Sequence, residues 1–562
     1  MDGVVELLKS NSATAGVLEP PAVGPQPEKK VSAAGSIGIW SERQVARVLL
    51  LVSLVIGAIT HGYHLFLYPL YTTDEGIYVE QAWAVLREGR LSPYTYFYDH
   101  APGGWLAIAG WVNLLPRQFE TFGNPINSGR VLILLVHLGS VFLLFTITKR
   151  LSGSYVAAFV AAFLFNVSPL AVFYQRQVLL DNLMVLWLLL SLYLLTRDDG
   201  RLVTTVLAGL SFGVAVVTKE NAIFFAPVLF YLLYKKLGVR LNRRFALGFW
   251  SFFAAGPVAA YFLYASLKNE LFPSRLSFDL NNPPADHVSL LYTIWWQLHR
   301  SKGSILDRHS LFWQFSLDSW LPKDHFILIA GGVAMLINLC LGLRRRNLGL
   351  LVASLLAISY TLYLARGSMV LEFYVVPLLP LLALNIGMLT AEVLRAVRLP
   401  RAGQLAAVAA LVGALVLPIG GGYVVAKGNQ GGTVLHDLYR LPLTDVQTQQ
   451  VAYIRQHIPP DSKIIGDDDL WVALHDVKPY YRFAHSHWKA AADPDVRDKL
   501  FGKNWRNVDY IVMSNQMLTA IRQNNGDGSE DWILEAISHA KPVWTLQRGG
   551  VSVGVYQVDK QS

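Results

Sequence analysis

The stretch from Thr72 to Trp105 reads TTDEGIYVEQAWAVLREGRLSPYTYFYDHAPGGW and directly follows the first long apolar run of the chain. It begins with an adjacent acid pair, Asp74 and Glu75, just past the predicted membrane exit. It ends with YDHAPGGW at residues 98–105, where charged, aromatic and turn-forming residues lie together. The other informative parts of the sequence are apolar helices and short polar corners, which we expect to face this loop.

The composition is that of a membrane protein with one soluble part. Of 562 residues, 53% are hydrophobic and 15% charged, whereas soluble proteins carry about 25% charged residues. The deficit lies in residues 45–426, a series of apolar runs, and residues 427–562 read like a soluble domain. We therefore predict a mainly α, polytopic membrane domain at 45–426 and a small C-terminal α/β domain at 427–562. Residues 1–44, rich in proline, are predicted to form a disordered tail.

The net charge of +9 does not indicate a nucleic-acid-binding protein. The basic residues lie between apolar runs, where membrane orientation and lipid headgroups account for them. The single cysteine, Cys340, excludes a disulfide within the chain and a metal site built from several cysteines. The expected partner at this level is the lipid bilayer.

About eleven apolar runs are long enough to cross a bilayer at a rise of 1.5 Å per residue. They lie near residues 46–68, 129–147, 153–174, 178–196, 202–218, 221–237, 245–266, 325–343, 348–365, 370–393 and 404–426. A twelfth apolar segment, Pro102 to Leu115, has about fourteen residues and opens with Pro-Gly-Gly. We expect this segment to be a juxtamembrane helix in the first external loop, because it is short for a span.

Basic residues are unevenly divided between the two sides of the predicted bundle. One set of corners is strongly basic and contains Lys149, Arg150, Arg197, Arg201, Lys235, Lys236, Arg240, Arg243, Arg244, Arg344, Arg345, Arg346, Arg395, Arg398 and Arg401. The opposite short corners carry only Arg176, Lys219 and Arg366. The positive-inside rule then predicts a cytoplasmic N-terminus and an extracytoplasmic C-terminal domain in the cell membrane. It also predicts that loops 70–128 and 267–324 share the extracytoplasmic side.

The acid pair allows two interpretations. Asp74 could take a proton from an acceptor hydroxyl as a general base, with Glu75 beside it. Alternatively, both acids occupy a helix N-terminus behind a Thr72 or Thr73 cap, where the helix dipole favours them. Spacing alone leaves both interpretations open.

The remaining polar corners also allow a functional and a structural interpretation. Lone basic residues on the translocated side could bind an anion such as phosphate, and Asp181 lies inside an apolar run, where an acid is usually functional or paired. An Arg176–Asp181 pair and a Lys219–Glu220 surface pair are the structural alternatives. The other candidates are Tyr98, Asp99, His100, Glu372 and Tyr374. The acids at 467–469 could bind a cation, but we expect them to form a solvated loop.

Together these motifs resemble the GT-C glycosyltransferases of the protein O-mannosyltransferase and lipid A aminoarabinose transferase type, over about residues 45–395. Four elements carry the resemblance, and they occur in the family's order. They are Asp74-Glu75-Gly76, Tyr98-Asp99-His100-Ala101-Pro102, the span from Leu207-Ala208-Gly209 to Thr218-Lys219, and Tyr374 to Pro380. His100 stands where the family commonly has lysine.

The resemblance implies an inverting transfer of a sugar from a polyprenyl-phosphate donor to a hydroxyl of a cell-envelope acceptor. The implied catalytic residues are Asp74, as the base, and Glu75. The implied donor phosphate ligands are Lys219, His100, Arg176 and Arg366. The implied orienting residues are Tyr98, Asp99, Asp181, Glu220, Glu372 and Tyr374.

Two other functions remain open on the sequence. A flippase for lipid-linked sugars would show inverted repeats and paired helix breaks at mid-membrane. A non-catalytic envelope-binding scaffold would leave Asp181 and the one-sided charges unexplained. The sequence names neither the sugar nor the acceptor, and it leaves a divalent cation (Mg²⁺ or Mn²⁺) as an open cofactor.

Overall fold

The computed structural model describes thirteen segments of the chain. These are residues 41–197, 201–237, 243–273, 289–299, 306–366, 370–398, 400, 402–407, 409–410, 412–413, 442–524, 528–548 and 550–561. Val45–Ser562 forms one compact unit. The predicted tail up to residue 40, most of the predicted span at 404–426, and Arg240 and Arg401 lie outside the described residues.

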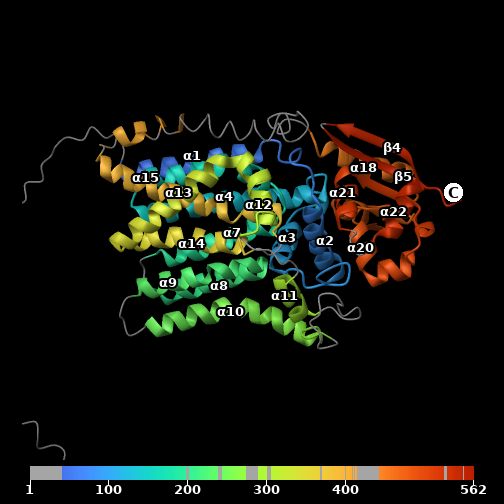
Figure 1. Cartoon of the computed structure of the whole chain (residues 1–562), viewed down its shortest axis with the longest axis horizontal. Helices are drawn as coiled ribbons and strands as arrows, with labels where there is room; N and C mark the ends of the chain where they lie inside the picture. Colours follow the sequence, from blue (N-terminus) through green and yellow to red (C-terminus); the bar gives the residue numbers. More distant parts are fainter. Residues whose placement is uncertain are drawn as a thin grey trace, which may run out of the picture. The chain divides into compact units, whose positions relative to one another are not determined.

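The membrane domain is built from apolar helices that lie side by side (Figure 1). They are α1 (Glu42–Gly62), α4 (Pro125–Ser152), α5 (Tyr155–Val167), α6 (Pro169–Tyr174), α7 (Leu180–Leu195), α8 (Leu202–Thr218), α9 (Ala226–Lys236), α10 (Arg243–Leu267), α13 (Leu321–Arg345), α14 (Leu348–Leu364) and α15 (Leu378–Val397). Within the described residues, five stretches have the length and composition of a complete span, and four further apolar helices have 10–17 residues. The prediction of a mainly helical, polytopic membrane protein is confirmed.

Several predicted spans are not continuous α-helices, and two of them show the cause or the form of the break. The run at 153–174 divides into α5 and α6 at Ser168, because Pro169 disfavours helical backbone at the residue before it. Ser168 then caps α6 by accepting a hydrogen bond from the Ala171 amide. The run at 221–237 begins as a 3₁₀ helix, η2 (Glu220–Phe225), before α9.

The first external loop folds into two juxtamembrane helices, α2 (Thr73–Glu88) and α3 (Gly103–Asn113). Thr72 and Glu75 form a capping box at the start of α2. The eleven residues of α3 span only about 16 Å, which is too short for a bilayer, as predicted. Gly103 lets α3 meet the end of α8, since a Cβ at this position would lie 2.7 Å from the Val217 carbonyl oxygen.

The C-terminal domain contains a five-stranded sheet of order β2-β1-β3-β5-β4. Its strands are β1 (Ile464–Gly466), β2 (Ala484–Ser486), β3 (Tyr510–Ser514), β4 (Ala540–Arg548) and β5 (Val551–Val558). β1 is parallel to β2 and β3, and β5 is antiparallel to β3 and β4. Its helices are α18 (Asp445–His457), α19 (Asp468–His475), α20 (His487–Ala492), α21 (Asn515–Asn524) and α22 (Asp531–Ser538). The small α/β domain is confirmed.

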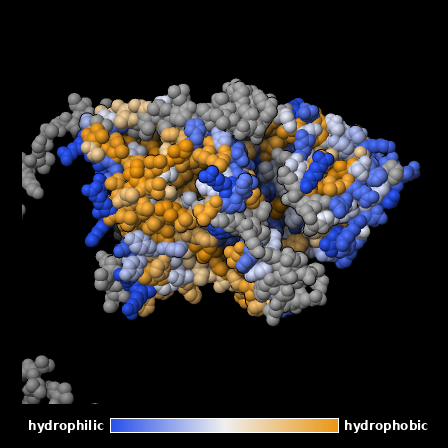
Figure 2. Space-filling model, in the orientation of Figure 1, coloured by the Kyte–Doolittle hydropathy of each residue, from blue (hydrophilic) through white to orange (hydrophobic). Residues whose placement is uncertain are grey.

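Helix α2 joins the two parts of Val45–Ser562, because it packs on α3 and on α19. Its Gly76 lies against the α19 backbone, where a Cβ would come within 2.3 Å of the Asp468 carbonyl oxygen. Figure 2 shows hydrophobic residues gathered over the helices and hydrophilic residues over the C-terminal domain, in line with one part in lipid and one in water.

Candidate active site

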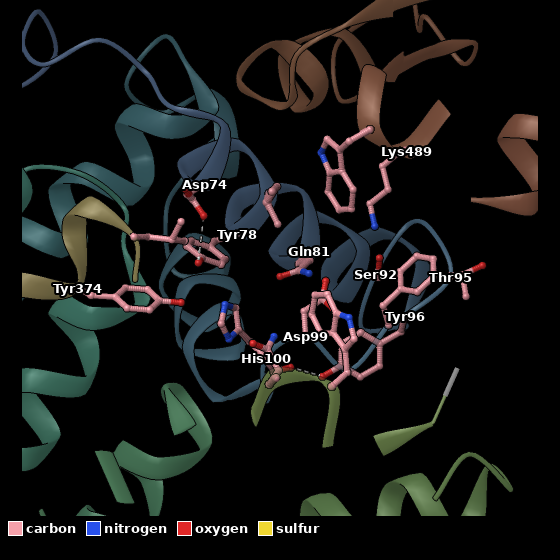
Figure 3. A pocket seen from close by; sticks show the side chains of 16 residues that line it. Asp74, Tyr78, Gln81, Ser92, Thr95, Tyr96, Asp99, His100, Tyr374 and Lys489 are labelled. Carbon is pink, nitrogen blue, oxygen red and sulfur yellow. Dashed lines mark hydrogen bonds between the residues drawn. The ribbon is translucent and has the colours of Figure 1, made fainter. Parts of the chain in front are cut away.

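One face of α2 lines a polar cavity of about 190 Å³. Asp74, Ile77, Tyr78 and Gln81 follow the i, i+3, i+4, i+7 spacing that places residues on one side of a helix. Figure 3 shows Asp74 on one side of the cavity and Lys489 on the other, with Gln81 between them. The remaining lining residues are Ser92, Thr95, Tyr96, Phe97, Asp99, His100, Trp296, Gln297, Leu371, Tyr374 and Trp488.

Asp74 is half-buried at the N-terminal end of this face. The Tyr78 hydroxyl donates to its carboxylate across 3.4 Å (Figure 3). Burial raises the pKa of Asp74 above its ordinary value, while the positive charges of Lys219 and His100 oppose that rise. A carboxylate with a raised pKa is a stronger base, and this one opens into a cavity.

Glu75 points away from the cavity and is fully buried. Arg130 donates to both of its oxygens, across 2.8 and 2.7 Å. The Val178 and Thr72 amides also donate to them, across 3.0 and 3.2 Å. The predicted catalytic role of Glu75 is therefore not supported by its position. Both of its carboxylate oxygens already accept hydrogen bonds, and those from Arg130 hold α2 against α4.

A second cavity of about 400 Å³ lies beside the first, among α8, η2, α10, α14 and α11 (Leu290–His299). Its walls are largely apolar, and its charged lining residues are Asp99, His100, Lys219, Glu220 and Arg366. The two cavities share Asp99, His100, Gln297 and Tyr374 as lining residues. A polar space that contains Asp74 thus adjoins an apolar space that contains Lys219.

Lys219 follows the last residue of α8 and is buried. Its ammonium lies 3.1 Å from a carboxylate oxygen of Asp181 and faces the rings of Tyr374 and Phe373 at 4.9 and 5.1 Å. Within the described residues the ammonium has no partner in hydrogen-bond geometry. Lys219 is therefore a buried cation whose N–H groups are not hydrogen-bonded to any of these residues, which suits an anionic ligand in the second cavity.

His100 lies at the junction of the cavities. Its Nδ1 is 3.1 Å from a carboxylate oxygen of Glu220, and the Ala101 amide donates to the same carboxylate. The Tyr96 hydroxyl donates to the His100 carbonyl across 2.5 Å. Tyr98, with a left-handed φ of 58°, lines the second cavity and donates its hydroxyl to Glu270. The predicted His100, Glu220, Tyr98, Asp99 and Tyr374 are thus brought together.

Of the other two predicted basic residues, one lines a cavity and one does not. Arg366 lines the second cavity and lies over the Tyr363 ring at 4.1 Å. Arg176 lines neither cavity, since it is buried and donates to the carbonyls of His61, across 3.1 Å, and Tyr63, where α1 ends. The Arg176–Asp181 alternative is not formed, because Asp181 lies against Lys219.

Two predicted acidic features also differ from expectation. Glu372 lines neither cavity and pairs with Lys323 across 2.5 Å. The acids at 467–469 do not form a solvated loop, since Asp467 caps α19 and Asp468 and Asp469 are buried in its first turn. In the described parts of the chain, no group of three or more His, Cys, Asp or Glu side chains is placed to hold a metal ion.

Several lining residues were missed by sequence analysis. Tyr78 and Gln81 could have been found, because they follow Asp74 at helical spacing. Lys489 and Trp488 come from the C-terminal domain and Gln297 from α11, and nothing in the local sequence connects them to Asp74.

Comparisons with known proteins support this fold. Residues 108–264 match the family described as dolichyl-phosphate-mannose-protein mannosyltransferase. The structure is similar to that of ArnT from Cupriavidus metallidurans bound to undecaprenyl phosphate, with a TM-score of 0.57 and 18% identity, over 92% of this chain and 99% of that one. No curated protein matches the chain in sequence.

Two structures of the oligosaccharyltransferase from Archaeoglobus fulgidus are also similar. The apo form gives a TM-score of 0.57 and 11% identity, over 93% of this chain and 75% of that one. AglB from the same organism, in complex with an inhibitory peptide and a dolichol-phosphate, gives 0.54 and 12%, over 92% and 75%. The chain therefore has the GT-C fold, and its resemblance to GT-C membrane glycosyltransferases is confirmed.

Proposed function

We propose that this protein is an inverting membrane glycosyltransferase. It moves a sugar from a polyprenyl-phosphate donor to a hydroxyl of a cell-envelope acceptor, on the extracytoplasmic face of the cell membrane. The observation that carries this proposal is the junction of the two cavities at Asp99, His100, Gln297 and Tyr374. Such a junction lets a lipid-linked donor and a polar acceptor meet.

The apolar cavity suits the donor. Val217, Ile223, Phe224, Val258 and Phe262 are among its apolar lining residues, and they offer an isoprenoid chain an environment like that of the bilayer. Lys219 and Arg366 supply positive charge in the same cavity for the phosphate. The ring faces beside Lys219 keep this charge partly shielded from water, which strengthens its attraction for an anion.

The polar cavity suits the acceptor. Asp74 takes the proton of the attacking hydroxyl as its oxygen bonds to the anomeric carbon. The bond from that carbon to the phosphate oxygen breaks, and polyprenyl phosphate leaves as an anion stabilised by Lys219. In this single displacement the hydroxyl attacks the face of the anomeric carbon opposite the departing phosphate, so the configuration at that carbon inverts.

The proposal is tested with purified protein and a panel of short-chain polyprenyl-phosphate sugars, with crude cell envelope as acceptor. We expect one donor to support transfer and Asp74→Asn to lower the rate by roughly 10²–10⁴-fold. The matched control is Glu88→Gln, an acid on the same helix outside both cavities, which should retain the rate. Donor movement across reconstituted vesicles, with no transfer from any donor and no effect of Asp74→Asn, would overturn the proposal in favour of a flippase.

A further inference from the structure

The C-terminal domain contributes a lysine to the catalytic cavity. Lys489 belongs to α20, is only 3% exposed, and lines the cavity that contains Asp74. Figure 3 shows its side chain directed from the C-terminal domain toward the region of Ser92. A cation in this position is unusual, because burying a charge is costly unless it is paired.

Aromatic rings surround the Lys489 ammonium, but these contacts leave its N–H groups without hydrogen bonds. It lies 4.0 Å from the ring centre of Trp488, 5.0 Å from that of Phe97 and 5.1 Å from that of Tyr94. Cation–π contact offsets part of the cost of burial. Within the described residues the ammonium makes no hydrogen bond and no ion pair within 4 Å, although an ammonium has three donors.

The charge of Lys489 acts on a neighbouring acid, Glu80, but in the described part of the chain the two side chains form no ion pair. Glu80 is buried, and its two oxygens have no hydrogen-bond partner in the described part of the chain. Burial and the charge of Asp468 raise the pKa of Glu80 well above its ordinary value, which Lys489 only partly opposes. This shift disfavours the charged form of Glu80, so that Glu80 is a weak counter-charge for Lys489.

The position of Lys489 is fixed by contacts between the first external loop and the C-terminal domain. The Thr95 amide donates to Asp493 across 2.8 Å, directly behind α20. The Trp471 indole donates to the Tyr94 hydroxyl across 2.7 Å. The lysine is thus held at the cavity by the same loop that carries His100.

We propose that Lys489 binds an anionic group, a phosphate or a carboxylate, on the acceptor. This inference rests on the proposed function, since it assigns the acceptor side of the same cavity. Asp74 and Gln81 are two helical turns apart, about 10 Å, so an acceptor can place its hydroxyl at Asp74 and its anion toward Lys489. The Gln81 side chain lies between them, and its Oε1 has no hydrogen-bond partner among the described residues.

The test measures binding without donor, so its result does not depend on whether transfer occurs. The probes are octyl glucoside and octyl glucoside 6-phosphate, titrated calorimetrically into protein in lipid nanodiscs. We expect wild type to bind the phosphorylated probe at least about tenfold more tightly, and Lys489→Gln to lose this preference. Lys489→Arg should retain most of it, and Lys499→Gln, which changes an exposed lysine of the same domain, should retain all of it.

Two outcomes would overturn the inference. One is equal binding of both probes by wild type, which decides the matter even if Lys489→Gln does not fold. The other is an unchanged preference in folded Lys489→Gln, which would leave Lys489 a purely structural role. Failure of the proposed function is a separate result, because it would show as absent transfer with the phosphate preference intact.

Discussion

Asp74 and Glu75 are neighbours in the sequence, but their carboxylates serve different purposes. Successive side chains on an α-helix point about 100° apart, so the two acids of α2 cannot face the same side. Asp74 opens into the polar cavity, and Glu75 lies between α2 and α4 with Arg130. Both acids lie in the first turn of α2, where the structural interpretation placed them, and only Asp74 has a position that suits the base we propose.

Replacement of Glu75 should affect stability more than chemistry. Glu75→Gln leaves the buried Arg130 guanidinium without a counter-charge, and removing one member of a buried pair costs about 3–5 kcal/mol. We expect a clearly lower thermal unfolding midpoint in detergent. Asp74→Asn is the matched control and should keep the midpoint, because burial already disfavours its charged form. A stable Glu75→Gln protein without activity would contradict this assignment.

Lys219 must be tested together with Asp181, since either change alone leaves a buried charge uncompensated. The double variant Lys219→Gln with Asp181→Asn keeps the site neutral and of similar size. We expect it to fold and to bind polyprenyl phosphate at least about tenfold more weakly than wild type, because a charge-assisted contact is lost. Unchanged affinity in the folded double variant would exclude Lys219 as the phosphate ligand.

At the scale of elements, α2 is the helix on which both parts of Val45–Ser562 meet. Gly76→Ala places a methyl group 2.3 Å from the α19 backbone, so the two helices must separate. We expect a loss of about 1–3 kcal/mol in stability, and weaker acceptor binding as Trp488 and Lys489 shift with their domain. Thermal unfolding and acceptor titration measure the two effects.

Gly110 in α3 provides the control for Gly76. A Cβ at Gly110 meets no atom within 4 Å, and alanine is the better helix former. Gly110→Ala should therefore leave stability unchanged or slightly raised. Equal stabilities of the two glycine variants would show that the packing of α19 on α2 does not depend on the close approach at Gly76.

Local patterns predicted most of the elements but only part of the site. Apolar runs identified the membrane helices, and the short segment after Pro102 was correctly expected to be α3. The pairing of Glu75 with Arg130 and the entry of Lys489 into the cavity join residues far apart in the chain. The periodicity of a sequence does not predict such contacts, because they arise only when helices and domains pack together.

At the scale of the whole molecule, the C-terminal domain is a wall of the candidate active site rather than an appendage. It contributes Lys489 and Trp488 to the cavity and docks through α19 on the helix that carries Asp74. On the proposed function, acceptor recognition and catalysis depend on the same interface. A substitution at this interface should change the affinity for the acceptor more than the affinity for the donor.

The stability of this interface should depend on pH. Burial, together with the charge of Asp467, raises the pKa of Asp468 to about 7, with Asp469, His487 and Trp488 also close. An acid with a raised folded-state pKa stabilises the fold at low pH. That contribution is lost as pH rises from about 4 to about 7, because the folded state binds more protons. We expect a lower unfolding midpoint at pH 8 than at pH 5.

Asp468→Asn isolates this group, since asparagine remains neutral and can still accept the hydrogen bond from the Trp488 indole. The variant should lose part of the difference between pH 5 and pH 8, mainly by gaining stability at pH 8. His487, whose pKa is raised by its hydrogen bond to Glu530 despite burial, contributes a residual dependence of the same sign. An unchanged pH difference in Asp468→Asn would exclude Asp468 as its source.

The single-turnover rate of sugar transfer by Asp74→Asn at saturating donor tests the central claim most directly. Saturation removes any effect on donor binding, which we assign to the other cavity, so the rate reports the role of Asp74 on the acceptor side. We predict a rate roughly 10²–10⁴-fold below that of wild type, in a protein that is folded and still binds donor. A rate within about twofold of wild type would contradict the assignment of Asp74 as the catalytic base.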